Sequence, residues 1–384
     1  MNVYLDNNAT TKVAPEVLDA MLPFFKENYG NASSMHTFGG SMKKHIDKAR
    51  EQVAALINAD PQEIIFTSCG TESDNAAIRS IIETVPGRKH LIISRVEHPA
   101  VLTTADYMEK KGYRVSKIQV DSEGILDTEQ LKNELTDETA LVSLMWANNE
   151  TGVIFPIEEI AGLVKEKGTI LHSDAVQAAG KIHLDMGKTP VDMLAISGHK
   201  LHAPKGIGVL YVRRGTPFAP FMLGGHQENG RRAGTENVPY IVGLGAAAEL
   251  AAKKMNEEVV LLKQMRDRLE NTLLKNCPDS KRNGHPEKRL PNTTNISFEY
   301  IEGESILLML DREGIAASSG SACTSGSLEP SHVMRAMGVP FTAAHGSIRF
   351  SLSRYNTMDE IDHVIEKLPP IILRLREMSP FIKK

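Results

Sequence analysis

A lysine and an aspartate near the middle of the chain have the spacing that aldehyde chemistry on an amino acid requires. Lys200 follows Ser197 and His199 directly after the apolar run 191–196, and Asp174 follows the apolar stretch 169–172. Partial desolvation at the end of a strand lowers the pKa of a lysine amine, which frees its lone pair to attack an aldehyde. An aspartate one strand away can keep a pyridine nitrogen protonated. The pair therefore predicts pyridoxal 5'-phosphate (PLP), whose protonated ring acts as an electron sink.

The elements that would position this pair are short apolar runs alternating with segments of helical period, which predicts a mostly parallel α/β sheet. The expected strands are 64–67, 90–94, 114–120, 141–146, 169–172, 191–196 and 208–212. Polar clusters follow five of them at their carboxyl ends, where open α/β sheets bind ligands. One site is therefore expected there, with these candidate residues: Gly70, Thr71, His98, Asn149, Asp174, Gln177, Ser197, His199 and Lys200.

Several of these side chains also have an ordinary structural interpretation. The turn at Gly70 and Thr71 suits a phosphate at a helix N-terminus, but it also suits a plain helix cap. Asp174 would face a pyridinium, or else an arginine or a helix cap. Asn149 and Gln177 would contact the ring oxygen of PLP, or else serve as structural amides.

The second half of the chain predicts a smaller α/β domain. An amphipathic helix is expected over 246–276, followed by strand 295–298, helix 305–310, helix 329–337 and strand 348–352. Thr357 and Glu360 form a capping-box pattern at the start of a last helix, which Pro369 and Pro370 are expected to break or kink. With 384 residues the chain exceeds the usual size of a single core, so two domains are expected.

Composition argues against several classes of partner. The 44 Lys and Arg residues face 48 Asp and Glu residues, and no long basic run is present, so nucleic acid is not an expected partner. No apolar stretch approaches the ~20 residues that span a bilayer, so we expect no membrane association and a cytoplasmic location. His199 and His202 lack a third ligand of suitable spacing, so no resident metal is expected.

Two further residues in the second half have chemistry of their own. Cys323 lies among small residues from 318 to 327, which favours an accessible, reactive thiol, although a flexible linker has the same composition. Cys69 and Cys277 are interpreted as structural or incidental. Arg349 alternates with serines along strand 348–352, which suits a bidentate clamp on a carboxylate or, equally, a surface ion pair.

Ten motifs in order resemble those of the PLP-dependent cysteine desulfurases, a class V aminotransferase group of the nitrogenase-maturation and iron–sulfur-assembly branch. They are YLDNNATT at 4–11, NASSMH at 31–36, TESDN at 71–75, EHPAV at 97–101, NNETG at 148–152, DAVQ at 174–177, SGHK at 197–200, RRAGTEN at 231–237, SSGSACTSGSLEPSHVMRAMG at 318–338 and IRFSL at 348–352. The resemblance implies PLP-transferase fold type I, the aspartate-aminotransferase type. We expect a large domain over 16–258 with a seven-stranded sheet, and a small domain from 1–15 and 259–384.

The resemblance also implies a role for each matching residue. Lys200 would bind PLP as an imine, His98 would stack on the ring, Asp174 would pair with the pyridine nitrogen, Asn149 and Gln177 would contact the ring oxygen, and Gly70, Thr71, Ser197 and His199 would hold the phosphate. Thr235 would reach the phosphate of the other subunit's PLP, which implies a homodimer. Arg349 would clamp the substrate carboxylate, with Asn8 and Asn31 in the same pocket.

The implied reaction converts L-cysteine to L-alanine and leaves a persulfide on Cys323, from which an iron–sulfur scaffold protein would receive the sulfur. A transient cluster at Cys323 stays open. The chain departs from many relatives at Cys69, where glycine is common, and at Ala32, where proline is common. The enzyme alternatives are selenocysteine lyase and a class V aminotransferase, which a substrate panel separates. A non-catalytic sulfur or iron–sulfur carrier is the other alternative, and turnover by the isolated protein decides against or for it.

Overall fold

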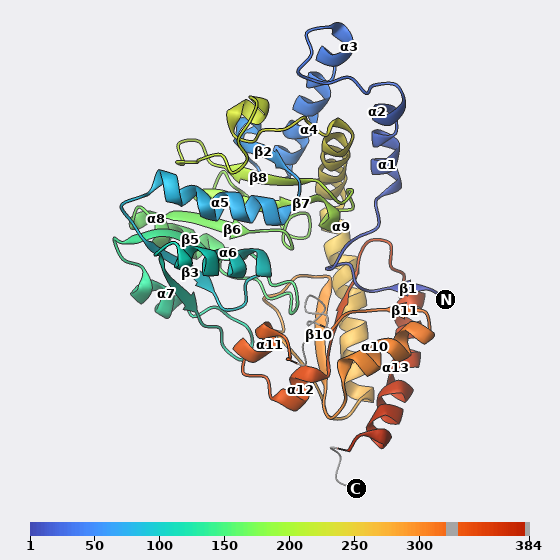
Figure 1. The fold of residues 1–384 in the computed structure, drawn as a ribbon. Helices are drawn as coiled ribbons and strands as arrows, with labels where there is room; N and C mark the ends of the chain where they lie inside the picture. Colours follow the sequence, from blue (N-terminus) through green and yellow to red (C-terminus); the bar gives the residue numbers. More distant parts are fainter. Residues whose placement is uncertain (320–328, 381–384) are drawn as a thin grey trace.

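The computed structural model describes residues 1–319 and 329–380, and its central feature is one seven-stranded sheet (Figure 1). The strand order is β2-β8-β7-β6-β5-β3-β4, and β8 is antiparallel to both of its neighbours while the other pairs are parallel. The strands are β2 (Ile64–Thr67), β3 (His90–Ser94), β4 (Arg114–Ile118), β5 (Thr139–Ser143), β6 (Ile170–Asp174), β7 (Met193–Ser197) and β8 (Gly208–Val212). The predicted α/β class with a mostly parallel seven-stranded sheet is confirmed.

Helices cover both faces of this sheet because successive strand residues point to opposite sides. Ile93 belongs to one buried cluster with α5 (Gly70–Thr84) and α6 (Pro99–Lys110). Its neighbour Ile92 belongs to a second cluster on the other face. That cluster includes residues of α1 (Pro15–Met21), α4 (Lys43–Leu56), α7 (Thr128–Glu134), α8 (Ile157–Glu166) and the first part of α9 (Val238–Asn276). The short helices α2 (Pro23–Lys26) and α3 (Thr37–Gly40) lie near α1 and α4 (Figure 1).

The second half forms a smaller sheet of order β12-β10-β9, with all pairs antiparallel. Its strands are β9 (Ser280–Arg282), β10 (Thr293–Phe298) and β12 (Ser347–Ser351), and α10 (Gly303–Arg312) and α13 (Met358–Met378) pack on the same apolar cluster as this sheet. The N-terminal strand β1 (Val3–Tyr4) pairs in parallel with β11 (Ile315–Ala316). The first residues of the chain therefore lie in the smaller part, far in sequence from their partners.

The last helix confirms one expectation and corrects another. Thr357 and Glu360 form the predicted capping box. Pro369 and Pro370 were expected to break or kink this helix; a break is wrong, because α13 runs from 358 to 378 with both prolines inside it, and a kink stays a prediction. The buried side chains around the prolines, Leu368, Ile371 and Ile372, pack in the apolar cluster of the small part and hold the helix in place. No helix in the described ranges is long and apolar enough to cross a membrane.

The long helix α9 joins the two parts of the molecule (Figure 1). Its side chains as far as Met255 pack in a large-domain cluster, whereas those from Leu262 onward pack in the small-domain cluster. This change falls around the boundary expected at residue 258, which stays a prediction. The helices α11 (His332–Ala336) and α12 (Phe341–His345) come late in the sequence, but Met334 and Ala344 pack in the large-domain cluster. The two parts are thus tied together by α9 and by α11 and α12.

Candidate active site

A cavity of about 520 Å³ lies at the carboxyl ends of the parallel strands. Most of the predicted site residues line it: Asn8, Gly70, Thr71, His98, Asn149, Asp174, Gln177, Ser197, His199, Lys200 and Arg349. Asn31 and Thr235 are not among the described residues that line it, and Cys323 lies outside the described residues. The cavity thus collects side chains from both ends of the chain at the edge of the sheet where a ligand was expected.

Asp174 ends β6 and is only 7% exposed. Its Oδ1 accepts a hydrogen bond from the backbone N–H of Val176 at 2.9 Å. Burial raises the pKa of Asp174, while His98 and Lys200 lower it. A buried carboxyl group needs a cation nearby to remain ionised, and the protonated nitrogen of a pyridine ring would supply that charge.

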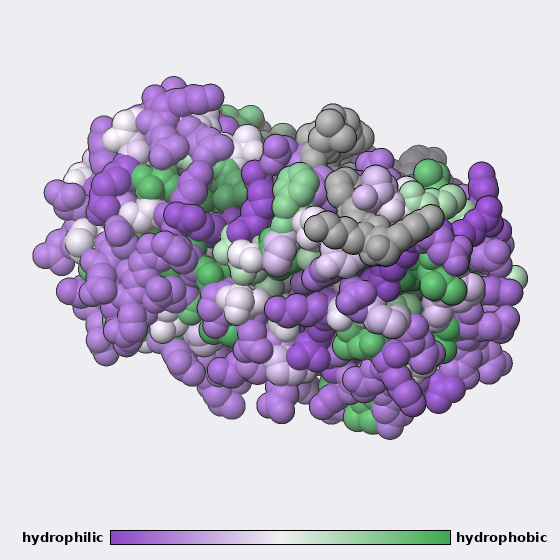
Figure 2. Space-filling model, turned by 90° about the horizontal axis from the view of Figure 1, so that it is seen from below, coloured by the Kyte–Doolittle hydropathy of each residue, from purple (hydrophilic) through white to green (hydrophobic). Residues whose placement is uncertain are grey.

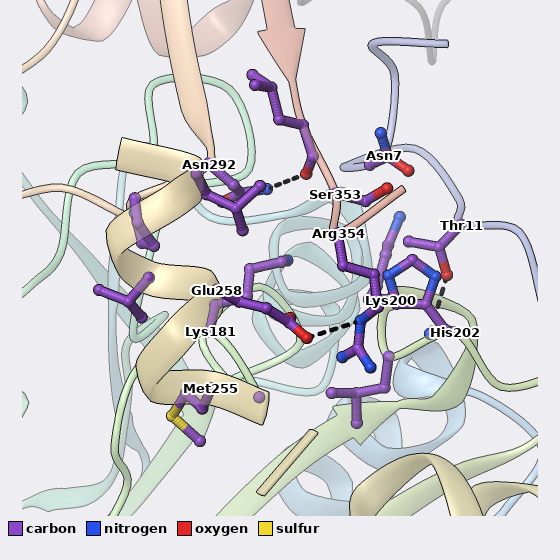
Figure 3. A pocket seen from close by; sticks show the side chains of 16 residues that line it. Asn7, Thr11, Lys181, Lys200, His202, Met255, Glu258, Asn292, Ser353 and Arg354 are labelled. Atoms are coloured by element: carbon purple, nitrogen blue, oxygen red, sulfur yellow. Dashed lines mark hydrogen bonds and ion pairs between the residues drawn. The ribbon is translucent and has the colours of Figure 1, made fainter. Parts of the chain in front are cut away.

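Lys200 ends the short 3-10 turn η2 (Gly198–Lys200) that follows β7. Its Nζ donates to the backbone carbonyls of Asn8 at 2.5 Å and Ala9 at 2.6 Å. These two residues belong to the N-terminal segment, so the chain brings a distant loop against the lysine amine. Lys200 also lines a second cavity of about 30 Å³ on the side of α9 (Figure 3).

The N-terminus of α5 offers a place for a phosphate. The helix begins at Gly70, where a Cβ atom would lie 2.8 Å from Cγ2 of Val176. Ser197 Oγ, close to the same point, is buried and has no hydrogen-bond partner in the described part of the chain. Free N–H groups and the positive end of a helix dipole favour an anion, and the unpaired hydroxyl adds a donor. These residues therefore fit the phosphate of PLP.

His98 is the N-cap of α6, and its Nδ1 accepts a hydrogen bond from the backbone N–H of Ala100 at 3.1 Å. Burial lowers the pKa of the ring, Asp174 raises it and Lys200 lowers it. The cap bond assigns the neutral tautomer that carries its proton on Nε2. His98 is therefore set up as a hydrogen-bond donor at the cavity, and protonation of Nδ1 would break its cap bond.

Arg349 lies on β12 and is held by both the N-terminal segment and a large-domain loop. Its Nη2 donates to Oδ1 of Asp6 at 2.7 Å, and its Nη1 donates to the backbone carbonyl of Asn149 at 3.0 Å. Its Nε is buried without a hydrogen-bond partner in the described ranges. A fixed guanidinium with a free donor at a cavity suits a carboxylate ligand.

Comparisons with known proteins agree with this arrangement. The family model described as Aminotransferase class-V matches residues 3–364. A cysteine desulfurase of Nostoc sp. is 61% identical over 379 residues, which covers 99% of this chain and 95% of the relative. The "Cysteine desulfurase NifS" of Azotobacter vinelandii is 58% identical over 381 residues, with the same coverage. A solved structure named "NIFS-LIKE PROTEIN" aligns with a TM-score of 0.92 at 40% identity, covering 98% of this chain and 100% of that protein.

The chain belongs to the class-V aminotransferases, among the cysteine desulfurases. This membership confirms the predicted family, its fold and its PLP cofactor. The separate roles assigned to Lys200, Asp174 and His98 stay predictions, because similarity of whole chains does not test single residues.

Buried acids near the cavity were not predicted as site residues. Asp74 and Glu150 line the cavity, and Glu97 is a charge neighbour of Asp174. Burial raises the pKa of Glu97 to about 8 and that of Glu150 to about 7. Glu150 Oε2 accepts a hydrogen bond at 2.6 Å from Ser331, the N-cap of α11. Glu97 and Glu150 stand directly beside His98 and Asn149 in the sequence, and that adjacency was the available signal.

Of the other cysteines and histidines, Cys69 and His199 line this cavity, whereas Cys277 and His202 do not. Cys277 is buried, and burial raises the pKa of its thiol to about 11, so it is unreactive near neutrality. Cys69 is half-buried and caps α5. Burial lowers the pKa of His199 and of His202 to about 4 each. In the described ranges no group of three or more His, Cys, Asp and Glu residues is arranged to hold a metal.

Proposed function

We propose that this protein converts L-cysteine to L-alanine and takes up the sulfur as a persulfide on Cys323. The observation that carries the proposal is that Lys200, Asp174 and the N-terminus of α5 line one cavity at the carboxyl end of the sheet. This set matches the aldehyde, the ring nitrogen and the phosphate of PLP. Relatives at 55–61% identity are named cysteine desulfurases, which supports the same reaction here.

The substrate would be held through its carboxylate by Arg349. The Arg349 fork is fixed by Asp6 and by the Asn149 carbonyl, so little side-chain entropy remains to be lost on binding. A solved relative described as "SspA in complex with cysteine", 33% identical over 93% of this chain with a TM-score of 0.82, supports cysteine as the ligand. Asn8 lines the same cavity, and Asn31 is proposed to complete the pocket.

PLP would be held by Lys200, by Asp174 at its ring nitrogen, by His98 on its face, by Asn149 and Gln177 at its ring oxygen, and by Gly70, Thr71, Ser197 and His199 at its phosphate. When bound, it supplies an electron sink for the bonds at the substrate Cα and Cβ. The chain's own contribution would be a charged Asp174 for the ring nitrogen and the amine of Lys200 for proton transfer. The closeness of both groups to one cavity supports this division.

Sulfur transfer would take place on the thiolate of Cys323. The thiolate attacks the substrate sulfur, so one S–S bond forms and the Cβ–S bond breaks, and the electron pair left on carbon takes up a proton to give alanine. Access of this thiol to the cavity is supported by the described residues on either side of Cys323, because Ser319 and Ser331 both line the cavity wall. Ser331 is anchored to Glu150, which fixes one end of the approach.

The test is to incubate the purified PLP-bound protein with L-cysteine and measure alanine and the mass of the Cys323 peptide. We expect alanine together with one added sulfur atom on Cys323. Cys323→Ser should bind PLP normally and lose persulfide formation, whereas Cys69→Ala should keep both. Sulfur found on Cys69 instead, or full turnover by Cys323→Ser, would refute the assignment of the acceptor.

We also propose that two copies form a homodimer, with Thr235 reaching the partner's PLP phosphate. Large apolar side chains are exposed around α1 to α3, among them Tyr29 at 71% and Met35 at 103%. The opposite end of the molecule shows mainly hydrophilic residues with small separate hydrophobic groups (Figure 2). The loop that carries Thr235 is fixed to α5 by an ion pair of 2.9 Å between Arg232 and Glu72. Light scattering of the purified protein tests the dimer.

The delivery of the sulfur is a further part of the proposal. We propose transfer from Cys323 to an iron–sulfur scaffold protein in the cytoplasm. The relative named "Cysteine desulfurase NifS" at 58% identity supports the release of sulfur from cysteine that such a transfer requires. Transfer of labelled sulfur from the persulfide to a scaffold protein tests this step.

We also propose the domain boundaries at 15 and 258, which are supported by the change of core cluster between Met255 and Leu262.

A further inference from the structure

A second lysine lies close to the predicted PLP lysine and has no role in the reaction described above. Lys181 comes four residues after Gln177, in the turns that follow β6. Its Nζ donates to the backbone carbonyl of Gln177 and to its side-chain Oε1, each at 3.0 Å. Burial, together with the charges of Lys200 and Arg349, lowers the pKa of Lys181 to about 7.

The bond from Lys181 determines which way the Gln177 amide faces. Because Oε1 accepts from Lys181, the Nε2 group is left on the other side, where it donates to the backbone carbonyl of Asn8 at 3.0 Å. The same carbonyl accepts from Lys200 Nζ. A continuous chain of hydrogen bonds therefore runs from Lys181 through Gln177 and Asn8 to Lys200.

Lys181 and Lys200 also line one cavity of about 30 Å³, roughly the room of one or two waters (Figure 3). The other charged or titratable groups lining it are His202, Glu258 and Arg354. Glu258 lies 3.0 Å from Arg354 Nε, so its charge is already matched. Burial lowers the pKa of His202 to about 4, which leaves its ring neutral at pH 7. The positive charge of Lys181 acts on Lys200 and Arg349, and it also acts on the rings of His199 and His202.

We propose that Lys181 is a positioning residue that fixes the Gln177 amide with Nε2 as the donor offered to PLP, and that its charge favours the unprotonated state of the Lys200 nitrogen. The inference rests on the proposed attachment of PLP to Lys200. The amide orientation and the charge of Lys181 both favour the unprotonated Lys200 nitrogen. The Gln177 Nε2 donor at the ring oxygen of PLP withdraws negative charge from the neighbourhood of the Lys200 nitrogen. The cation of Lys181 repels a proton on that same nitrogen.

The experiment is a pH titration of the visible absorbance of the PLP-bound protein in Lys181→Met, Lys181→Gln and Lys181→Arg. We expect the midpoint of the titration to rise by up to about one pH unit in the two neutral variants, because Lys181 itself loses its charge as pH rises through about 7. The arginine variant keeps the charge and should stay close to wild type. Lys188→Met is the matched control, because Lys188 is 87% exposed and pairs only with Asp185 among the described ion pairs.

Each outcome bears on a different claim. Neutral variants that bind PLP with the wild-type midpoint would overturn the inference, as would a shift in Lys181→Arg as large as that in Lys181→Met. Failure of both neutral variants to show a native circular dichroism spectrum would make Lys181 a structural residue and would also overturn it. A wild-type protein without any visible band after addition of PLP would instead refute the proposed function.

Discussion

The close approach between Gly70 and Val176 gives a direct test of the proposed phosphate site. An ideal Cβ on Gly70 would lie 2.8 Å from Cγ2 of Val176, whereas ordinary contacts fall at 3.4–4 Å. The start of α5 must therefore move by more than half an ångström in Gly70→Ala, or Val176 must give way. Overpacking of this kind costs about 1–3 kcal/mol, and the movement occurs where the helix would meet the phosphate. We expect the affinity for PLP to fall about tenfold to a hundredfold, at ~1.4 kcal/mol per factor of ten.

The assay is titration of the apoprotein with PLP, followed by absorbance, beside a thermal unfolding curve. Alanine is a better helix former than glycine by about 0.5–1 kcal/mol, which offsets only part of the overpacking cost, so the melting temperature should fall modestly. Gly162→Ala is the matched control, because Gly162 lies in α8 with no atom within 4 Å of the added Cβ. It should leave PLP affinity unchanged.

The double variant Gly70→Ala/Val176→Ala separates crowding from other causes. Val176 lines the cavity, so Val176→Ala alone is expected to weaken PLP binding slightly. Removing its Cγ atoms should nevertheless recover most of the affinity that Gly70→Ala loses, with a coupling of about 1 kcal/mol or more. Equal affinities of wild type and Gly70→Ala, or additive losses in the double variant, would show that this helix start does not hold the phosphate.

Two further predictions concern charge at the site. Arg349→Lys cannot keep the bonds to both Asp6 and Asn149. Loss of hydrogen bonds to a charged group costs ~1.5–3 kcal/mol, so the KM for L-cysteine should rise about tenfold to a hundredfold while PLP binding stays intact. The control is Arg268→Lys, at an exposed ion pair. Burial raises the pKa of Glu97 to about 8 from 4.5, so the folded protein keeps a proton that the unfolded chain releases, and the free energy of unfolding should fall as pH rises through this window. Urea unfolding of Glu97→Gln apoprotein should show a weaker fall, and an unchanged pH dependence would contradict the assigned protonation.

Much of the large domain could be predicted because its strands are short apolar runs with clear ends. Strands 64–67, 90–94 and 208–212 have the bounds of β2, β3 and β8. The strand expected over 141–146 was placed too late, since β5 covers Thr139–Ser143 and the apolar run continues beyond the hydrogen-bonded ladder. Apolar character marks burial, whereas strand pairing depends on the neighbouring strand.

The start of α9 shows why periodicity alone gave a short helix. The helix begins at Val238, eight residues before the expected start at residue 246. This first part is enclosed by other helices: a Cβ on Gly243 would meet Met21 and one on Gly245 would meet Ala49. A helix buried on several sides has no polar face, so its amphipathic pattern is absent.

The contacts that complete the site were beyond the reach of sequence reasoning. Lys200 donates to the carbonyl of Asn8, 192 residues away, and Arg349 donates to Asp6, 343 residues away. Backbone carbonyls carry no residue-type signal, and the N-terminal segment is held at the site by its pairing with β11 and by backbone bonds such as Thr11 N–H to the carbonyl of His199. Motif spacing located the candidate residues, and the tertiary fold determines what each one touches.

The carboxyl groups beneath the cavity differ in a way that selects one of them for a charged role. Burial raises the pKa of Asp74 well above its usual value, and the carboxyl groups of Asp174 and Glu97 raise it further. Glu97 is also expected to stay protonated at pH 7. Burial raises the pKa of Asp174 as well, but His98, the N–H of Val176 and Lys200 oppose it. A cation in this cavity would therefore ionise Asp174 before Asp74. Glu97 keeps its proton and so adds no negative charge beside Asp174.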